Sequence, residues 1–344
     1  AKKRLILGSR GSRLALVQAD YVKKLLEAEY GDLEVKVKVI KTTGDKVKKA
    51  PLSEVGGKAL FTKEIEEGLL EGKIDIGVHS MKDLPIALPA GLIIASILKR
   101  EDPRDVFISK KYDSLLHLPK KAKVGTSSLR RRSQLKNFRP DLEVVPLRGN
   151  VDTRLRKVGT AGIDAIIVAA AGVTRLGLAN KITEYLPPTL MLPAVGQGAI
   201  GLEIREADQA TRRMVEVLND IESADCVRAE RAFLAGLAGD CQVPIGAFAE
   251  INGTTLKITG VVASPDGREL IRDRVEGNMR EPVALGERLA KSLLGQGARE
   301  ILNIRHQVPD AEFLEEESHF SGLDFGQVQQ IVEELEQVLA GTMD

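Results

Sequence analysis

One stretch, residues 121–157, most constrains the fold because it repeats one device twice: a short apolar run, a few small or polar residues, then a helical pattern rich in arginine. The apolar runs 122–125 and 142–147 predict two short buried strands. Thr126–Ser128, which follow the first run, are good helix N-cap residues, and Gly149–Asn150 follow the second. Two successive strand–turn–helix units indicate an open α/β sheet.

The arginines of this stretch fall where strands end and helices begin. The stretch holds seven arginines and three acidic residues. We expect Arg130 and Arg131 in the first turn of one helix, Arg148 at the end of a strand, and Arg154 about one turn into the next helix. Ligands of open α/β sheets bind at the carboxyl ends of strands, where helix N-termini offer free N–H groups. Adjacent cations there cost stability unless an anion lies between them. The pattern favours a pocket for a multiply negative ligand, and the alternative is a solvated basic face.

Length and charge narrow the class of protein. A chain of 344 residues predicts two or three domains. Its net charge of +1 hides an asymmetry, because residues 306–344 hold ten acidic residues and no lysine or arginine, which leaves +11 on residues 1–305. The absence of tryptophan disfavours single-strand nucleic-acid binding. The chain shows neither a signal-peptide pattern nor an apolar run near the roughly 20 residues of a membrane helix. We therefore expect a cytoplasmic protein without nucleic acid or membrane as partner.

The rest of the chain divides into three parts. The segment 99–105, with Pro103 inside it, indicates a crossing to a second part, and 192–204 indicates a return crossing followed by a strand. A Ser-Pro-Asp-Gly turn then joins two strands of a small α+β part. The predicted strands are 5–8, 33–40, 74–78, 92–98, 163–168, 256–263 and 269–276; the predicted helices are 14–30, 61–70, 170–176, 223–237 and 283–302, with a long loop over 41–58 and an apolar helical face over 328–339.

The segment HSMKDLP, residues 79–85, could carry chemistry. It places Lys82 beside Asp83 at a strand end. Asp83 could act as an acid, as a base, or as a counter-ion to a cationic intermediate. The alternative is a surface ion pair between the two neighbours.

The two cysteines differ in their surroundings. Cys241 lies between Asp240 and Gln242 in a loop bounded by glycines, where a basic neighbourhood would make it a nucleophile. Cys226 lies within a helical run, where burial is the simpler role. They do not make a disulfide framework. A Cys-His hydrolase with His79 as base lacks a triad signature, and the histidines and cysteines have no metal-ligand spacing, so we expect no metal.

Eight motifs in order resemble the porphobilinogen deaminase (hydroxymethylbilane synthase) family: LGSRGSRLAL, VGGKALF, VHSMKDLP, EDPRDVF, VGTSSLRRR, LRGNVDTRL, LPAVGQGA and GDCQVPIGA. The match runs from about Leu5 to Leu302. It implies two periplasmic-binding-protein-like (type II) α/β domains joined by hinge strands, plus a C-terminal α+β domain. The domains implied are residues 1–98 with 199–219, then 104–193, then 221–305 with the cysteine loop, followed by an acidic extension with a helix at 306–344.

The resemblance also implies a transferase. Cys241 would hold a dipyrromethane cofactor by a thioether. Four porphobilinogen molecules would be added in turn, each losing ammonia, before hydrolysis releases hydroxymethylbilane for tetrapyrrole synthesis. Asp83, with Lys82, would be catalytic, because a carboxylate can stabilise the azafulvene cation left by the departing ammonia. The loop over 41–58 would close as a lid, and the enzyme would be a monomer.

The site residues implied by the resemblance form two sets. The cofactor-binding residues would be Cys241, Lys82, Asp83, Thr126, Ser127, Ser128, Arg130, Arg131, Arg148, Gly149 and Asn150. The substrate-binding residues would be Arg10, Ser12, Arg148, Arg154, Arg175, Gln197, Lys58 and Phe61. The arginines would take the acetate and propionate groups of the growing chain.

A competing interpretation is a non-catalytic anion-binding protein of the two-domain kind. It would explain the arginines and the crossings. It would not explain the third domain or the loop around Cys241. A covalent chromophore would distinguish the two.

Overall fold

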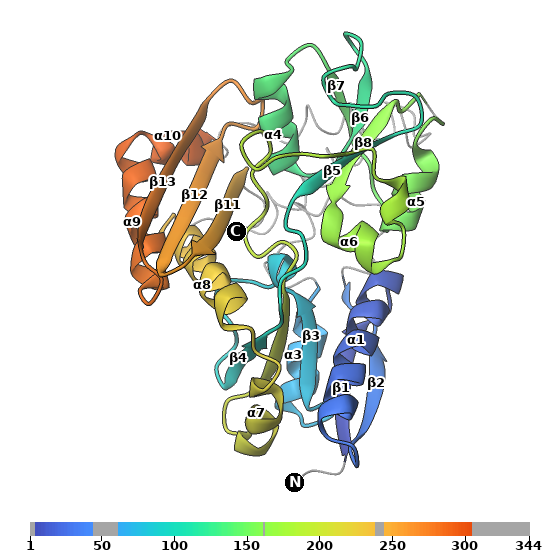
Figure 1. Ribbon diagram of the computed structural model, residues 1–344, viewed down its shortest axis with the longest axis vertical. Coiled ribbons are helices and arrows are strands. Elements are labelled where there is room, and N and C mark those ends of the chain that lie inside the picture. The colour runs from blue at the N-terminus through green and yellow to red at the C-terminus, as the bar shows by residue number, and fades with distance from the viewer. Residues whose placement is uncertain (1–3, 44–60, 161, 238–243, 305–344) are drawn as a thin grey trace, which may run out of the picture.

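The computed structural model describes residues 4–43, 61–160, 162–237 and 244–304, which form three units with one sheet each (Figure 1). The predicted loop over most of 41–58, the loop around Cys241, and the acidic extension with its helix lie outside the described residues.

The first unit is a five-stranded sheet in the order β2-β1-β3-β10-β4. Leu5 and Leu7 point to one face, where they pack with α1 and α7, whereas Ile6 points to the other face, towards α3. This alternation is what a strand covered by helices on both faces requires. The elements are β1 (Arg4–Arg10), α1 (Arg13–Glu29), β2 (Glu34–Ile40), α3 (Lys63–Leu70), β3 (Ile76–Ser80), the 3₁₀ turn η1 (Met81–Asp83), β4 (Leu92–Ile97), β10 (Ile200–Arg205) and α7 (Gln209–Glu216).

The second unit is a sheet in the order β7-β6-β8-β5-β9. Leu135 of α4 packs with Phe107 on one face, and Val173 of α6 packs with Val106 on the other. The elements are β5 (Asp105–Ser109), β6 (Lys123–Gly125), α4 (Leu129–Phe138), β7 (Glu143–Val145), α5 (Val151–Lys157), β8 (Ala165–Ala169), α6 (Ala170–Arg175), η2 (Ala179–Lys181) and β9 (Glu184–Tyr185).

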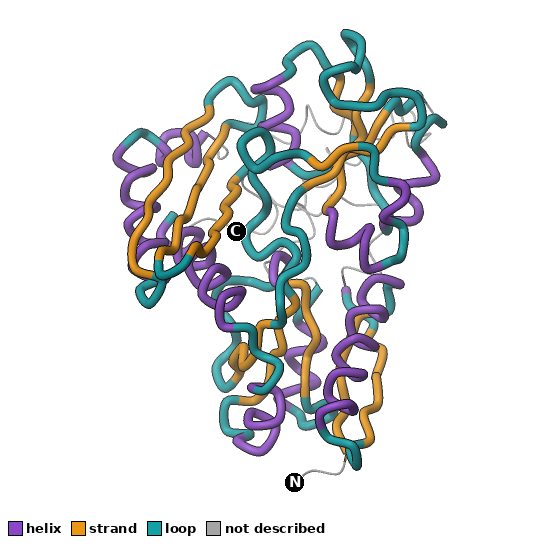
Figure 2. The backbone as a smooth tube through the Cα atoms, viewed as in Figure 1, coloured by secondary structure: helices purple, strands orange, loops and turns teal. Residues whose placement is uncertain are grey.

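The chain crosses between these two units twice. It leaves the first sheet after β4 and enters the second at β5, and it returns after β9 to place β10 antiparallel between β3 and β4. Both crossings, residues 98–104 and 186–199, are loops (Figure 2). The two crossings predicted from the sequence are confirmed.

The third unit is an antiparallel sheet, β11-β12-β13, packed against helices. Its core includes Phe233 of α8 and Leu289 of α9, and Gly260 leaves the space that the Phe233 ring fills, since a Cβ at Gly260 would lie 2.6 Å from that ring. The elements are α8 (Ile221–Gly236), β11 (Ile245–Asn252), β12 (Thr255–Ala263), β13 (Leu270–Asn278), α9 (Pro282–Gly295) and α10 (Ala298–Ile304).

The predicted architecture of two α/β units joined by two crossings, followed by an α+β unit, is confirmed. Several element predictions were wrong or incomplete. The helix predicted over 283–302 is two helices, because Gly297 takes a φ of +100° between them. The strand predicted over 142–147 ends at Val145, so Arg148 lies beyond the strand rather than at its end. Strands β5 and β11 and helix α7 were not predicted.

Within the described ranges, none of the helices has both the length and the apolar character needed to cross a membrane.

Candidate active site

The two adjacent arginines at the start of α4 share a buried carboxylate. Ser128 caps the helix, so Arg130 and Arg131 lie in its first turn as predicted. Arg130 Nη1 donates to Asp105 Oδ2 at 2.7 Å, and Arg131 Nε and Nη2 donate to Asp105 Oδ1 at 3.1 and 2.8 Å. Asp105 is 0% exposed and each arginine is 5% exposed. From the sequence, an anion is expected between these two cations. In the described structure, that anion is the Asp105 side chain.

The charge state of this cluster follows from its contacts. Burial opposes ionisation of Asp105, but the charges and hydrogen bonds of Arg130 and Arg131 outweigh it and hold the pKa of Asp105 well below its usual range. Burial lowers the pKa of Arg130, while Asp105 acts in the opposite direction. Two guanidinium groups against one carboxylate leave the cluster with a net positive charge.

Gln197, from the second crossing, joins the same cluster. Its Nε2 donates to Asp105 Oδ1 at 2.9 Å and to the carbonyl of Pro103 at 2.7 Å. Its buried Oε1 has no hydrogen-bond partner among the described residues, and neither has the buried Nε of Arg130. Buried polar atoms without partners are uncommon in native proteins. This cluster therefore retains capacity for further hydrogen bonds.

Lys82 and Asp83 lie in η1, directly after β3. Asp83 is exposed and Lys82 is half-buried. Burial lowers the pKa of Lys82 to about 8, and among the charges around it Asp83 and Asp105 favour its ammonium form while Arg131 and Arg130 oppose it. The turn of the first unit thus lies within electrostatic reach of the arginines on α4 of the second unit.

A further cation, Arg154 of α5, completes this group. Burial and, to a smaller extent, the charge of Arg131 lower the pKa of Arg154 to about 10, whereas the charge of Asp83 acts in the opposite direction. Arg154 also donates from Nε to the carbonyl of Gly149 at 2.8 Å. Asp83 is accordingly a single exposed carboxylate that interacts with two desolvated cations, one from each α/β unit.

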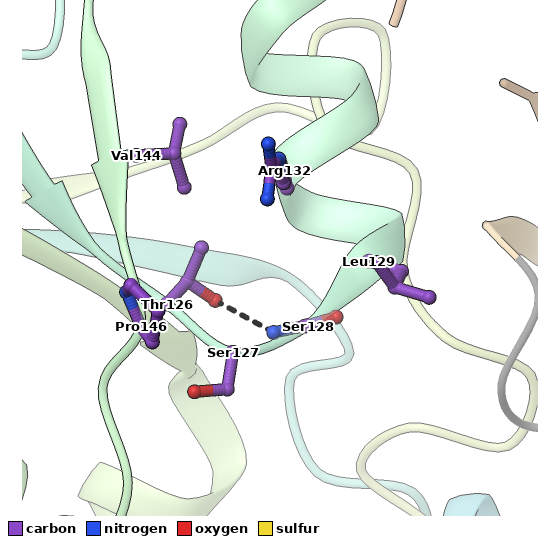
Figure 3. Close-up of a pocket in the computed structure, with 7 residues that line it drawn as sticks. All are labelled: Thr126, Ser127, Ser128, Leu129, Arg132, Val144 and Pro146. Atoms are coloured by element: carbon purple, nitrogen blue, oxygen red, sulfur yellow. Dashed lines mark hydrogen bonds between the residues drawn. The ribbon is translucent and has the colours of Figure 1, made fainter. Parts of the chain in front are cut away.

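The hydroxyl residues before α4 shape the turn. Thr126 Oγ1 accepts from the Ser128 N–H at 3.2 Å, Ser128 Oγ accepts from the Arg131 N–H at 3.4 Å, and Ser127 Oγ accepts from the Leu147 N–H at 2.9 Å. These residues line a small hollow beside α4 (Figure 3), whose lining is Thr126, Ser127, Ser128, Leu129, Arg132, Val144 and Pro146. Hydrogen bonds to these side chains within the protein therefore hold the turn.

The turn before α5 is built in a similar way. Asn150 Oδ1 caps the helix by accepting from the Thr153 N–H at 2.9 Å. Gly149 has a φ of +111°, and a Cβ there would also lie 2.9 Å from Thr153, so both conformation and space require glycine. Arg148 precedes this turn, three residues after β7 ends.

The other predicted substrate residues lie on separate elements. The Arg10 guanidinium, at the end of β1, lies 4.0 Å from the centre of the Phe61 ring. Ser12 caps α1 by accepting from the Ala15 N–H at 3.3 Å. Arg175 donates from Nη2 to the carbonyl of Gly198 at 2.7 Å, and burial lowers its pKa. Arg175 thereby lies beside the crossing that carries Gln197.

The predictions on the two cysteines and on Lys58 have different outcomes. Cys241 and Lys58 lie outside the described residues. Cys226 is buried in α8, and burial raises the pKa of its thiol to about 12, which fits the predicted packing role. Among the described residues, no group of three or more His, Cys, Asp or Glu is arranged to hold a metal ion.

Sequence reasoning missed two residues of this region. Asp105 had no assigned role; it begins β5, 25 positions before Arg130, and no local pattern in the sequence connects the two. Arg231 of α8 also went unnoticed; it donates to the carbonyls of Leu84, Pro85 and Ile86, directly after Asp83. No local pattern connects positions that are about 145 residues apart.

The fold and the site define a class of protein. Two α/β units are joined by two crossings, and a cation from each unit, Lys82 and Arg154, interacts with the carboxylate of Asp83. This arrangement suits a multiply negative ligand. A family described as "Porphobilinogen deaminase, dipyromethane cofactor binding domain" matches residues 5–213, and "Porphobilinogen deaminase, C-terminal domain" matches residues 224–295. The chain belongs to the porphobilinogen deaminase family.

Individual relatives agree with this assignment. The porphobilinogen deaminase of Geobacter sulfurreducens is 51% identical over 302 residues, which cover 88% of this chain and 95% of the relative. That of Syntrophomonas wolfei is 52% identical over 300 residues, covering 87% and 98%.

Similar solved structures are more distant. The methionine-binding protein MetQ is 15% identical with a TM-score of 0.41, covering 65% of this chain and 94% of that one. The aliphatic sulphonate binding protein SsuA from Escherichia coli is 14% identical with a TM-score of 0.38, covering 69% and 71%. Both TM-scores are below 0.5, so the family assignment rests on the sequence matches.

Proposed function

We propose that the protein is a porphobilinogen deaminase, a transferase that joins four porphobilinogen molecules head to tail with loss of ammonia and then releases hydroxymethylbilane by hydrolysis. The observation that carries the proposal is the position of Asp83, an exposed carboxylate that interacts with Lys82 and Arg154. A substrate with carboxylates at its edge and a cation forming at its centre needs this distribution of charge.

The described residues fit a dipyrromethane cofactor. Its acetate and propionate groups need N–H donors, and the N-termini of α4 and α5 supply them together with arginines. The buried Arg130 Nε has no partner among the described residues, and the cluster around Asp105 has a net positive charge. When bound, the dipyrromethane supplies the pyrrole carbon to which the first substrate is joined. The residues proposed to hold it are Lys82, Asp83, Thr126, Ser127, Ser128, Arg130, Arg131, Arg148, Gly149 and Asn150, with Cys241 as the covalent attachment.

Asp83 has the central role in this mechanism. As the C–N bond of porphobilinogen breaks, ammonia leaves and positive charge develops on the pyrrole. The Asp83 carboxylate can stabilise that charge and accept a hydrogen bond from the pyrrole N–H. Lys82, whose pKa is lowered to about 8, can bind a substrate carboxylate as an ammonium at neutral pH.

The remaining cations would hold the growing chain. Each added pyrrole brings two further carboxylates, so several separate binding positions suit the product better than one clamp. Arg154 and Arg175 belong to the second unit, and Gln197 belongs to the second crossing. Arg10 and Phe61 belong to the first unit. We assign substrate binding to Arg10, Ser12, Lys58, Phe61, Arg148, Arg154, Arg175 and Gln197.

The predicted domain boundaries and the cellular setting belong to the same proposal. The predicted divisions, 1–98 with 199–219, then 104–193, then 221–305, are consistent with the three sheets. We further propose that the protein is cytoplasmic and monomeric. Size-exclusion chromatography with light scattering would test the monomer by its mass in solution.

Intact mass spectrometry tests the function and the cofactor together. Wild-type protein purified from cells that make porphobilinogen should exceed its sequence mass by one dipyrromethane unit. The adduct should survive reduction, because thiols cleave disulfides and not thioethers. Cys241→Ala should show the bare mass and no turnover of porphobilinogen, whereas the matched control Cys226→Ala should keep both. An adduct that persists in Cys241→Ala would overturn the attachment site, and a fully loaded wild type that leaves porphobilinogen unchanged would overturn the function.

A further inference from the structure

One face of α8 packs under the turn that carries Lys82 and Asp83. Ala224 and Val227 of α8 belong to the same buried cluster as Met81 and Leu84, which flank those two residues. In Figure 1, α8 lies between the third sheet and the first unit. The third unit therefore supports the turn of the first unit directly.

Arg231 is the polar end of this same face. Positions 224, 227 and 231 follow the i, i+3, i+7 spacing that aligns side chains along a helix. Arg231 Nη1 donates to the carbonyl of Leu84 at 3.3 Å, and Nη2 donates to the carbonyls of Pro85 and Ile86 at 2.8 and 3.0 Å. The contacts begin one residue after Asp83.

The three bonded carbonyls are consecutive, which requires a particular kind of donor. In a regular strand, successive carbonyls point in opposite directions, so one side chain cannot reach three in a row. Residues 84–86 form no regular element. A guanidinium presents several N–H groups in a rigid fork, whereas a lysine ammonium is a single point donor on a flexible chain. The irregular path of the segment thus depends on an arginine.

The other side of the turn is anchored separately. The Met81 N–H donates to the carbonyl of Ala199 at 3.0 Å. Met81 also fits closely against Gly196 and Gly201, since a Cβ on either glycine would lie less than 3.0 Å from its side chain. The turn is fixed at its start by the second crossing and β10, and at its end by Arg231.

We propose that Arg231 is a positioning residue for the reaction: through Leu84, Pro85 and Ile86 it holds the Asp83 carboxylate where charge develops on the substrate. This inference rests on the proposed function, because Asp83 must act in catalysis. It also gives α8, whose C-terminal end leads toward the loop around Cys241, a direct connection to the catalytic turn.

A double-mutant cycle with Asp83 tests the proposal. Arg231→Lys should lower kcat for porphobilinogen by about 10- to 100-fold, because small misplacements of a catalytic group cost about that much, while KM changes less than about twofold. In an Asp83→Asn background, which should itself be slower by about 100-fold, the same Arg231→Lys change should cost less than about threefold. A residue that only stabilises the fold would give equal losses in both backgrounds.

The matched control is Arg228→Lys on the same helix. Arg228 is exposed and bonds only Asp225 among the contacts seen, at 2.8 Å, so it should retain wild-type kcat. Equal losses from Arg231→Lys with and without Asp83, or wild-type kcat in Arg231→Lys, would overturn the proposal.

A readout independent of activity separates this inference from the proposed function. Hydrogen exchange followed by mass spectrometry should show faster exchange for the peptide over residues 81–88 in Arg231→Lys, and unchanged exchange there in Arg228→Lys. Failure of the wild type to turn over porphobilinogen would refute the function. Unchanged exchange over residues 81–88 in Arg231→Lys would refute the positioning role whatever the reaction.

Discussion

Replacing Asp105 by asparagine isolates the energy of a fully buried carboxylate that two buried arginines share. The carboxylate accepts one hydrogen bond from Arg130, two from Arg131 and one from Gln197. Asparagine keeps the size but removes the charge, and its amide turns one acceptor into a donor that faces an arginine. Both arginines would remain buried without a counter-charge. Breaking a buried ion pair from one side typically costs about 3–5 kcal/mol, and we expect Asp105→Asn to lose stability in that range.

Urea unfolding followed by circular dichroism at pH 7 measures this loss. Hydrogen exchange should locate it in the second unit, which contains Asp105 and both arginines. The matched control is Asp141→Asn, because Asp141 also bonds an arginine, Arg139, at 2.7 Å but near the surface; it should leave the unfolding free energy almost unchanged. A loss below about 1 kcal/mol for Asp105→Asn would show that the arginines are stabilised by something other than this carboxylate.

The pH dependence of stability provides a second test of the Asp105→Asn prediction. Because the pKa of Asp105 is held below its usual range in the folded protein, its stabilising contribution is complete above the unfolded-state pKa of about 3.9. The contribution is lost as the pH falls through the folded-state pKa. The difference between wild type and Asp105→Asn should therefore be constant from about pH 5 to 7 and narrow in more acidic solution. A difference that grows on acidification would contradict the reasoning.

Two further predictions concern the cations of the site. Since burial lowers the pKa of Lys82 to about 8, the wild-type kcat/KM for porphobilinogen should fall as the pH rises through about 8. The Lys82→Arg variant keeps its charge and should not show that fall. An identical fall in both proteins would exclude Lys82 as its origin. The ionised Lys82 also costs stability at neutral pH, a cost that declines as the pH rises from about 8 towards the unfolded-state pKa of about 10.4. Arg148→Lys should weaken cofactor assembly or elongation by about tenfold or more, because it loses the two-pronged guanidinium fork, while the exposed Arg213→Lys in α7 should not, and equal rates would remove Arg148 from the site.

Local patterns were sufficient to place Arg130, Arg131 and Arg154 on their helices, and insufficient to predict what these arginines bind. Ser128 caps α4 and Asn150 caps α5 because short polar side chains satisfy free N–H groups nearby in the chain. The partner of Arg130 is 25 positions away on β5, and only the folded sheet brings it close. Periodicity and capping report local structure, whereas ion pairs of this kind depend on tertiary packing.

One error in the predicted elements has a clear physical cause. The periodic pattern over 283–302 continues through Gly295 and Gly297, and the positive φ of Gly297 ends the regular helix despite the apolar spacing on either side. A contact that no local pattern predicts is made by Arg272 of β13, which donates to the carbonyls of Pro188 and Thr189 at 2.9 and 2.6 Å. Arg272 thus links the third unit to the end of the second.

The third unit is more than a carrier for the loop around Cys241, because α8 reaches both crossings. Glu230 accepts from Arg100 of the first crossing and, at 2.7 Å, from the Gly196 N–H of the second. It also accepts from the Ala249 N–H of β11 at 2.8 Å. The neighbouring Arg231 holds the segment after Asp83. Glu230 and Arg231, consecutive residues of one helix, thus contact both crossings and the segment after Asp83, so a movement of the third unit relative to the other two would change contacts at both places.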